Sequence, residues 1–151
     1  MTRHEILAGE ITNDLAGLGY SPGMTDKEIL ALMLAENRVI SVDVPIGSLE
    51  AAILLNGLLG PISAVPDTSP AYGAARALLK LVMGPTSITQ ITYSDPTTRA
   101  QVDGMADALR DAGHITAAQH DLLLSLGRRT VSRAQEIGVP GVTEREIKEA
   151  R

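Results

Sequence analysis

Two histidines and a neighbouring acid are the side chains in this chain whose types most directly suggest metal chemistry. His114 and His120 lie six residues apart, and Asp121 follows the second of them. Imidazole and carboxylate groups bind zinc or iron, but a site needs three or four ligands in a tight geometry. The spacing matches no established ligand pattern, and a turn is expected between the two histidines. We therefore expect capping or surface histidines and no metal site.

Paired carboxylates are the second chemical possibility. Asp43 lies in a strand-like segment and Asp95 follows another, so neighbouring strands would bring the two acids close enough for acid–base catalysis. A simpler explanation is that Asp95 caps the next helix and Asp43 lies on the wet face of a strand. The chain has no cysteine and no G-x-x-x-x-G-K phosphate loop. We expect no catalytic residues, no enzymatic activity, no cofactor and no small-molecule ligand.

Three arginines suggest a third kind of site. Residues 116–139 are predicted to form a helix, a turn at Gly127 and a second helix over about 130–137, the order found in a helix-turn-helix. Arg128, Arg129 and Arg133 would then face phosphates. An ordinary helical hairpin explains the same pattern, and the net charge of −5 does not favour nucleic acid. A small DNA-binding regulator is the alternative hypothesis.

The elements that must position these residues are mainly helices. T-x-x-E capping boxes at Thr2, Thr25 and Thr143 each predict a helix start, the last of them opening a terminal helix expected to fray. Turn residues at 17–19 should end the first helix. Further helices are predicted over 49–59 after Ser48, over 71–83 after Ser69 and Pro70, from Asp95–Pro96 onward, and from Thr116 to about Leu126. A proline-rich loop is expected between the helices at 49–59 and 71–83.

Two segments have strand character. Residues 38–44 alternate apolar and polar side chains, and residues 87–93 are rich in β-branched types, so the two could pair. The predicted fold class is mainly α, a compact multi-helix domain of seven or eight helices with at most a minor two-stranded β element. We divide it into a helical region over 1–94 with the two strands and a central helical hairpin, and a C-terminal helical subdomain over 95–151, together one compact unit.

The core must be aliphatic, because the chain has no Phe or Trp and only three tyrosines. The predicted helices at 49–59 and 71–83 are apolar almost all round, and a chain of 151 residues offers few helices to cover them. An uncovered apolar patch usually marks contact with another chain. The candidate interface residues are Leu54, Leu55, Leu58, Leu59, Leu78, Leu81 and Met83.

From Ser69 onward the chain resembles small proteins encoded among the structural genes of tailed bacteriophages. The resemblance rests on Ser69–Pro70–Ala71 with the following helix, on the run GHITAA from Gly113, on LLLSLG from Leu122, and on residues 130–139 and 142–148. It is a packing pattern and carries no functional residues over to this chain. It implies a virion or tail-assembly role.

The sequence thus predicts a non-enzymatic structural or interaction protein, acting through aliphatic protein–protein interfaces. Its expected partners are other virion proteins or copies of itself, with a virion location in a phage and a cytoplasmic one otherwise. No signal peptide is recognised at the start. The longest apolar run, 49–65, is too short and too interrupted to cross a bilayer, so no membrane partner is expected.

Overall fold

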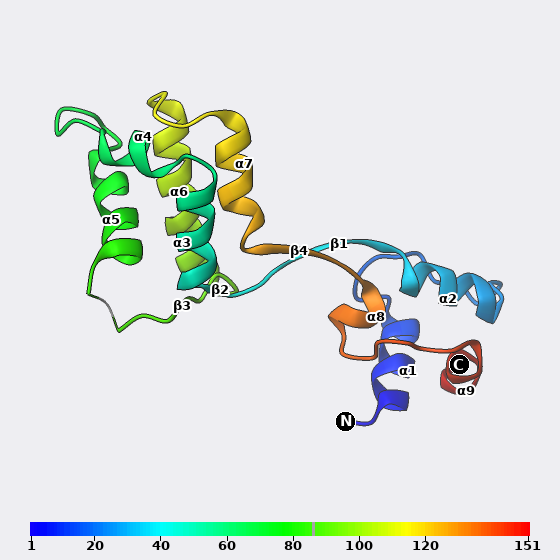
Figure 1. Ribbon diagram of the computed structural model, residues 1–151. Helices are drawn as coiled ribbons and strands as arrows, with labels where there is room; N and C mark the ends of the chain where they lie inside the picture. Colours follow the sequence, from blue (N-terminus) through cyan, green and yellow to red (C-terminus); the bar gives the residue numbers. More distant parts are fainter. Residues whose placement is uncertain (86) are drawn as a thin grey trace. The chain divides into compact units, whose positions relative to one another are not determined.

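The computed structural model describes residues 1–85 and 87–151, and these form two units (Figure 1). Unit 1 comprises Met1–Ile40 and Thr130–Arg151, and unit 2 comprises Ser41–Arg129. Unit 2 is therefore an insertion in the sequence of unit 1. The boundary expected at 94/95 falls inside unit 2, between β3 and α6. Local composition gives no sign of these two units, because unit 1 joins the two ends of the chain.

Unit 1 consists of helices around an aliphatic core. They are α1 (Arg3–Asn13), α2 (Asp26–Leu34), α8 (Arg133–Glu136) and α9 (Glu144–Ala150). The capping boxes at Thr2, Thr25 and Thr143 are all formed, each threonine hydroxyl accepting from the backbone of the glutamate three residues on. The α9 helix, where fraying was expected, packs against α1 and α2 and buries Ile147 completely.

The first helix ends earlier than its apolar spacing suggested. The α1 helix stops at Asn13, and Asp14 adopts a left-handed backbone conformation (φ 43°). The Asp14 carboxylate then accepts hydrogen bonds from the backbone N–H groups of Leu18 and Gly19. This local acceptor competes with continuation of the helix and fixes the loop that follows.

Unit 2 contains a ring of four helices, in which α3 contacts α5, α5 contacts α6, α6 contacts α7, and α7 returns to α3 (Figure 1). Its helices are α3 (Ile46–Leu55), α4 (Leu59–Ser63), α5 (Tyr72–Met83), α6 (Pro96–Asp111) and α7 (Ala117–Ser125). Asp95 caps α6 and Thr116 caps α7, as predicted. The inward side chains of these helices, among them Ile53, Ile62 and Leu109, form a second aliphatic core separate from that of unit 1.

Three helix starts in this unit differ from expectation. The α3 helix begins after Pro45 with no side-chain cap, so Ser48 lies inside the helix. The α5 helix begins after Ala71, and Ser69 instead accepts from the Ala71 N–H and contacts His114. The segment expected to be only a proline-rich loop contains α4, which buries Ile62 in the core. At these helix starts no side-chain cap is formed, and each helix buries aliphatic residues in the core.

The described residues contain two two-stranded sheets. The strand expected over 38–44 is divided into β1 (Glu36–Ser41) and β2 (Val44–Pro45). The predicted pairing is confirmed at one end, since β2 pairs antiparallel with β3 (Gln90–Ile91) and Val44 lies opposite Ile91. The longer β1 pairs with β4 (Arg128–Ser132), and each of these two strands contains a position at which the chain passes between units. The mainly-α fold class with a minor β component is confirmed.

The prediction of a helix over 130–137 is wrong for the first half of that range. Residues 128–132 form β4, and the short α8 begins only after Ser132, whose hydroxyl accepts from the Gln135 N–H in a further capping box. Thr130 and Val131 are β-branched and favour the extended backbone. Pairing with β1, which lies about ninety residues earlier, supplies the hydrogen bonds that a local helix would have supplied.

Candidate functional site

The candidate interface residues separate into exposed and buried sets. Leu55 is 83% exposed, Met83 65% and Leu54 50%. Leu58 and Leu78 lie in the core of unit 2 and are not available for an interface, which corrects that part of the prediction. Leu59 and Leu81 are half-buried against the same core. The residues that remain accessible lie on α3 and at the end of α5.

The outer face of α3 is aliphatic and hollowed. Leu49, Ala52 and Ile53 turn inward, which leaves the opposite side of the helix in solvent. A shallow hollow of about 350 Å³ lies on this side, lined by Gly47, Glu50, Ala51, Leu54 and Leu55. Its small lining residues, Gly47 and Ala51, precede the two leucines along the helix. Glu50 is the only charged group in α3.

The outer face of α5 has a different chemistry. Ala75 and Leu78 are buried on the inner side. The exposed residues are Gly73, Arg76, Ala77, Lys80 and Met83. The helix contains no acidic residue. The Arg76 guanidinium lies 4.9 Å from the centre of the Tyr72 ring, which holds this cation close to the helix surface.

A second apolar hollow of about 450 Å³ lies between the end of α5, β3 and α6. Its apolar lining consists of Leu81, Ile88, Ile91, Val102 and Met105. Its polar lining consists of Gln90, Thr92, Thr98 and Gln101. No charged side chain lines this hollow, so an apolar or uncharged surface is the kind it can accept.

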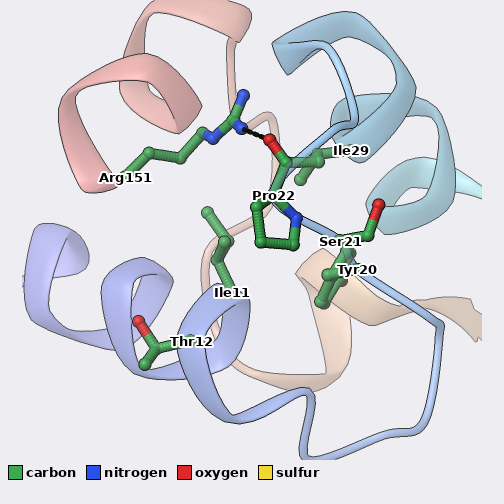
Figure 2. A pocket seen from close by; sticks show the side chains of 7 residues that line it. All are labelled: Ile11, Thr12, Tyr20, Ser21, Pro22, Ile29 and Arg151. Carbon is green, nitrogen blue, oxygen red and sulfur yellow. Dashed lines mark hydrogen bonds between the residues drawn. The ribbon is translucent and has the colours of Figure 1, made fainter.

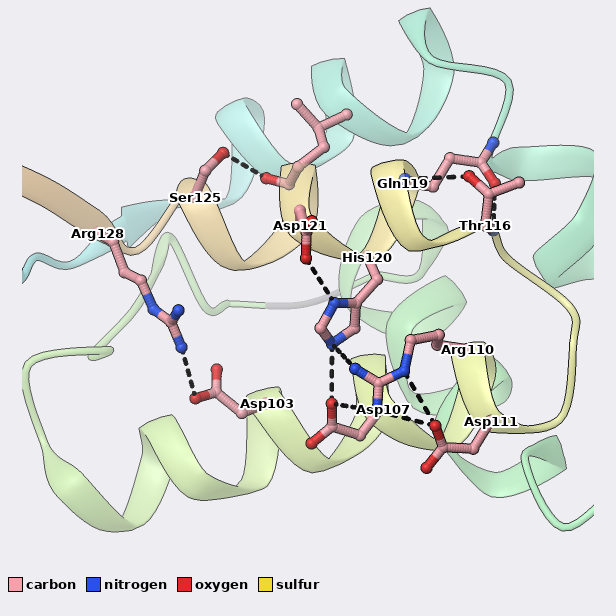
Figure 3. Close-up of polar contacts among 11 residues, drawn as sticks. Asp103, Asp107, Arg110, Asp111, Thr116, Gln119, His120, Asp121, Ser125 and Arg128 are labelled. Carbon is pink, nitrogen blue, oxygen red and sulfur yellow. Dashed lines mark hydrogen bonds and ion pairs between the residues drawn. The ribbon is translucent and has the colours of Figure 1, made fainter.

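The structure does not bring His114 and His120 together. His120 is buried between α6 and α7, with Asp107 Oδ1 2.8 Å from Nε2 and Asp121 Oδ1 3.1 Å from Nδ1 (Figure 3). Arg110 Nη1 also lies 3.2 Å from Nε2. His114 Nε2 instead lies 2.9 Å from the Ser69 hydroxyl.

These histidines fix helices and loops to one another. In the described part of the chain, no three histidine, cysteine or acidic side chains converge as a metal site would require. Asp121 is hydrogen-bonded to Nδ1 of His120, and Asp107, from the neighbouring helix, is hydrogen-bonded to Nε2. The polar cluster thereby links α6 to α7 across their packed surfaces.

The two carboxylates considered for acid–base chemistry have structural partners. Asp43 accepts from the backbone N–H and the hydroxyl of Ser94, and these bonds lower its pKa. Asp95 accepts from the Thr98 N–H at the start of α6, which lowers its pKa as well. Both acids are therefore held in the ionised form and lack the raised pKa of a proton donor.

The arginines considered for DNA contact do not share a recognition helix. Arg128 and Arg129 lie in β4, where Arg128 donates to Asp103. Arg133 is buried and forms a bidentate ion pair with Glu10, at 2.9 and 2.6 Å. The side chain of Arg133 therefore lies inside unit 1, and the helix-turn-helix over 116–139 is not formed. The DNA-binding alternative loses the element on which it depended.

A network extends from this ion pair. Glu136 accepts from Arg38 at 2.8 Å and lies 2.9 Å from Arg133. Hydrogen bonding to Arg38 is the main cause that lowers the pKa of the Glu136 carboxyl below its ordinary value of 4.5, and Arg133 lowers it further. The ionised form of Glu136 is therefore the form that stabilises unit 1.

This network predicts an acid-dependent loss of stability. A lowered pKa in the folded state contributes stability above the unfolded pKa, and this contribution is lost as the pH falls through the folded value. Glu136→Gln should therefore flatten the fall in unfolding free energy below about pH 4.5, measured by urea denaturation over a pH series. Glu36→Gln, at an exposed position of the same unit, is the matched control. Equal flattening in both variants would contradict the assignment.

Unit 1 also contains a pocket that the sequence did not predict. It has a volume of about 370 Å³ and is lined by Ile11, Thr12, Tyr20, Ser21, Pro22, Ile29 and Arg151 (Figure 2). Arg151 donates to the Pro22 carbonyl at 3.0 Å and pairs with Asp26 at 2.7 Å. Burial, and next the charge of Glu10, raises the pKa of Tyr20. Its hydroxyl is the one buried side-chain polar atom among the described residues without a hydrogen-bond partner.

Comparison with known proteins adds no relative. No family model matches the chain, and neither the curated proteins nor the solved structures contain a match. Among the described residues, none of the helices is both long enough and apolar enough to pass through a bilayer. The surface residues of the chain are therefore the observations from which a function can be proposed.

Proposed function

We propose that this chain is a non-enzymatic structural protein that binds other protein chains through the aliphatic outer surface of unit 2. The observation that carries this proposal is the exposure of Leu54 and Leu55 on α3, together with Met83 at the end of α5. Leu54 and Leu55 line a hollow together with the small residues Gly47 and Ala51. Such a surface is the kind that protein interfaces bury at their centre.

The energetics support an interface at this position. Removing a leucine side chain from water contributes about 1.5–3 kcal/mol. Two adjacent leucines and a methionine therefore contribute several such increments, enough to offset part of the entropy lost on association. Leu54, Leu55 and Met83 are not part of the core of unit 2. Burying them against a partner would therefore leave that core unchanged. Their aliphatic character is best explained by a partner.

The resemblance of residues 69–148 to small structural proteins of tailed phages supports a more specific proposal. In it, the chain is a virion or tail-assembly component whose partners are neighbouring particle proteins or copies of itself. The α5 outer face lies within the resembling region, whereas α3 precedes it. The proposal therefore combines a packing resemblance with an exposed surface, two independent lines of support.

Site-specific photo-crosslinking in the producing cell tests the proposal. A photoreactive amino acid at position 55 should yield covalent adducts with protein, detected as heavier bands by immunoblot. Position 15 is the matched control, because Leu15 is also a leucine, is 73% exposed and belongs to unit 1. Adducts at 55 above the level at 15 support the interface. Absence of adducts at 55, or equal yields at both positions, would contradict it.

A further inference from the structure

The outer faces of α3 and α5 are complementary in charge. The α3 helix carries one acidic residue, Glu50, and no basic residue. The α5 helix carries two basic residues, Arg76 and Lys80, and no acidic residue. All three side chains are exposed. Opposite charges on two surfaces favour their encounter and fix the register in which they meet.

We propose that the chain forms a symmetric dimer in which α3 of one copy packs antiparallel on α5 of the other, with Glu50 opposite Lys80. This inference rests on the proposed function and names the occupant of its aliphatic surface as a second copy of this chain. The ion pair sets the register. The leucines and the methionine supply the buried apolar area.

The antiparallel register also matches large side chains with small ones. Gly47 lies three residues before Glu50, and Met83 lies three residues after Lys80, so the exposed methionine faces the glycine end of the hollow. Leu54 lies four residues after Glu50 and faces Arg76, whose helix neighbours Gly73 and Ala77 are small and exposed. The aliphatic stem of an arginine packs well against leucine.

Other pairings fit less well. A parallel arrangement with the same ion pair places Gly47 against Ala77, which leaves a gap between two small residues. Packing α3 on a second α3 brings the two Glu50 side chains together without a cation in either helix. Of these three arrangements, the antiparallel α3–α5 contact is the one that joins opposite charges and complementary sizes at once.

The arrangement of the two helices in unit 2 allows this contact to form twice. The α3 and α5 helices are neighbours that run in opposite directions (Figure 1). A two-fold axis parallel to them places each α3 opposite the other copy's α5, again antiparallel. The interface is therefore isologous and closes at two copies. Every substitution in it acts at two equivalent contacts.

Charge reversal on the full chain tests the dimer. Sedimentation equilibrium should show a dimer for the unmodified chain, and Glu50→Lys or Lys80→Glu should each raise its dissociation constant by about tenfold or more, since each places like charges together twice. The double variant, Glu50→Lys with Lys80→Glu, restores the opposite charges and should recover most of the affinity. Asp67→Lys makes the same charge change as Glu50→Lys at an exposed loop of unit 2, and it should leave the dissociation constant unchanged.

Several outcomes would overturn the inference. A monomer at all concentrations would do so, as would a dimer that both single variants leave intact or a double variant that stays dissociated. Stronger association of a Glu50→Gln variant, which removes a like-charge pair, would indicate an α3–α3 contact instead. The mass of the adduct at position 55 separates this inference from the proposed function. An adduct containing only a different protein overturns the dimer and leaves the interface standing, whereas no adduct removes both.

Discussion

Arg133→Ala should lower the free energy of unfolding of unit 1 by about 3–5 kcal/mol. The arginine side chain is buried, as is Glu10, and two hydrogen bonds at 2.6 and 2.9 Å join them. Removing the cation leaves the Glu10 carboxylate without its counter-charge in a site that water does not reach. It also removes one partner of Glu136. The large effect comes from the stranded charge more than from the lost attraction.

Two variants distinguish this mechanism from simple loss of packing. Combining Glu10→Gln with Arg133→Met removes both charges and keeps much of the volume, so it should recover a large part of the lost stability. Arg145→Ala breaks an exposed ion pair with Glu149 on α9 and should change stability by less than about 1 kcal/mol. Urea denaturation measures the free energy of unfolding of each variant, and amide hydrogen exchange shows whether the loss of protection lies in unit 1. Equal losses for Arg133→Ala and Arg145→Ala would refute the account.

Gly127→Ala should destabilise unit 2 by about 1–3 kcal/mol. A β-carbon at this position would lie well inside van der Waals contact of the Tyr93 ring. Tyr93 is almost completely buried, and its hydroxyl donates to Asp103. Burial and this hydrogen bond therefore resist a displacement of the ring. The Gly127 carbonyl also accepts from the Val42 N–H at 2.8 Å, which restrains the backbone.

A second glycine provides the matched control. Gly104 lies in the interior of α6, and a β-carbon there meets no atom within 4 Å. Gly104→Ala should therefore raise stability by about 1 kcal/mol through helix propensity alone. The two substitutions are chemically identical and are expected to have opposite signs in the same unit. Denaturation with chemical denaturant measures both, and a shared sign would show that the Tyr93 contact does not limit position 127.

Features of the fold that depend on neighbouring residues were predictable from the sequence. The capping boxes at Thr2, Thr25 and Thr143 each involve a hydroxyl and a glutamate three residues apart, so a short stretch of sequence contains the whole interaction. The cap at Asp95 has the same local character. The mainly-α class follows from the sum of such signals with the aliphatic spacing of the helices.

Features of the fold that depend on residues far apart in the chain were not predictable from the sequence. The strand β4 replaces a predicted helix because it pairs with β1, and nothing in residues 128–132 identifies that partner. The burial of Arg133 depends on Glu10, more than a hundred residues away. An arginine near a helix start has the same local signature whether it faces solvent or an acid in the core. The sequence alone therefore suggested a phosphate contact.

The candidate interface shows the same limit at the level of single leucines. The α3 segment is apolar on nearly every side, so helical spacing could not tell Leu55, which is exposed, from Leu58, which is buried. That distinction arises from where α3 ends and α4 begins, at Asn56 and the left-handed Gly57. The sequence identified an apolar region, and the tertiary fold determines which of its residues are accessible.

The division of unit 1 between both ends of the chain has a consequence for biosynthesis. On the ribosome, residues 41–129 emerge as a continuous stretch, so unit 2 holds all of its own core before translation finishes. Helices α1 and α2 emerge before unit 2, yet Leu7, Ile29 and Met33 pack against Val139 and Ile147, which emerge after it. Residues 1–40 therefore remain without their core partners while all of unit 2 is synthesised, the stage at which a chaperone could bind their apolar side chains.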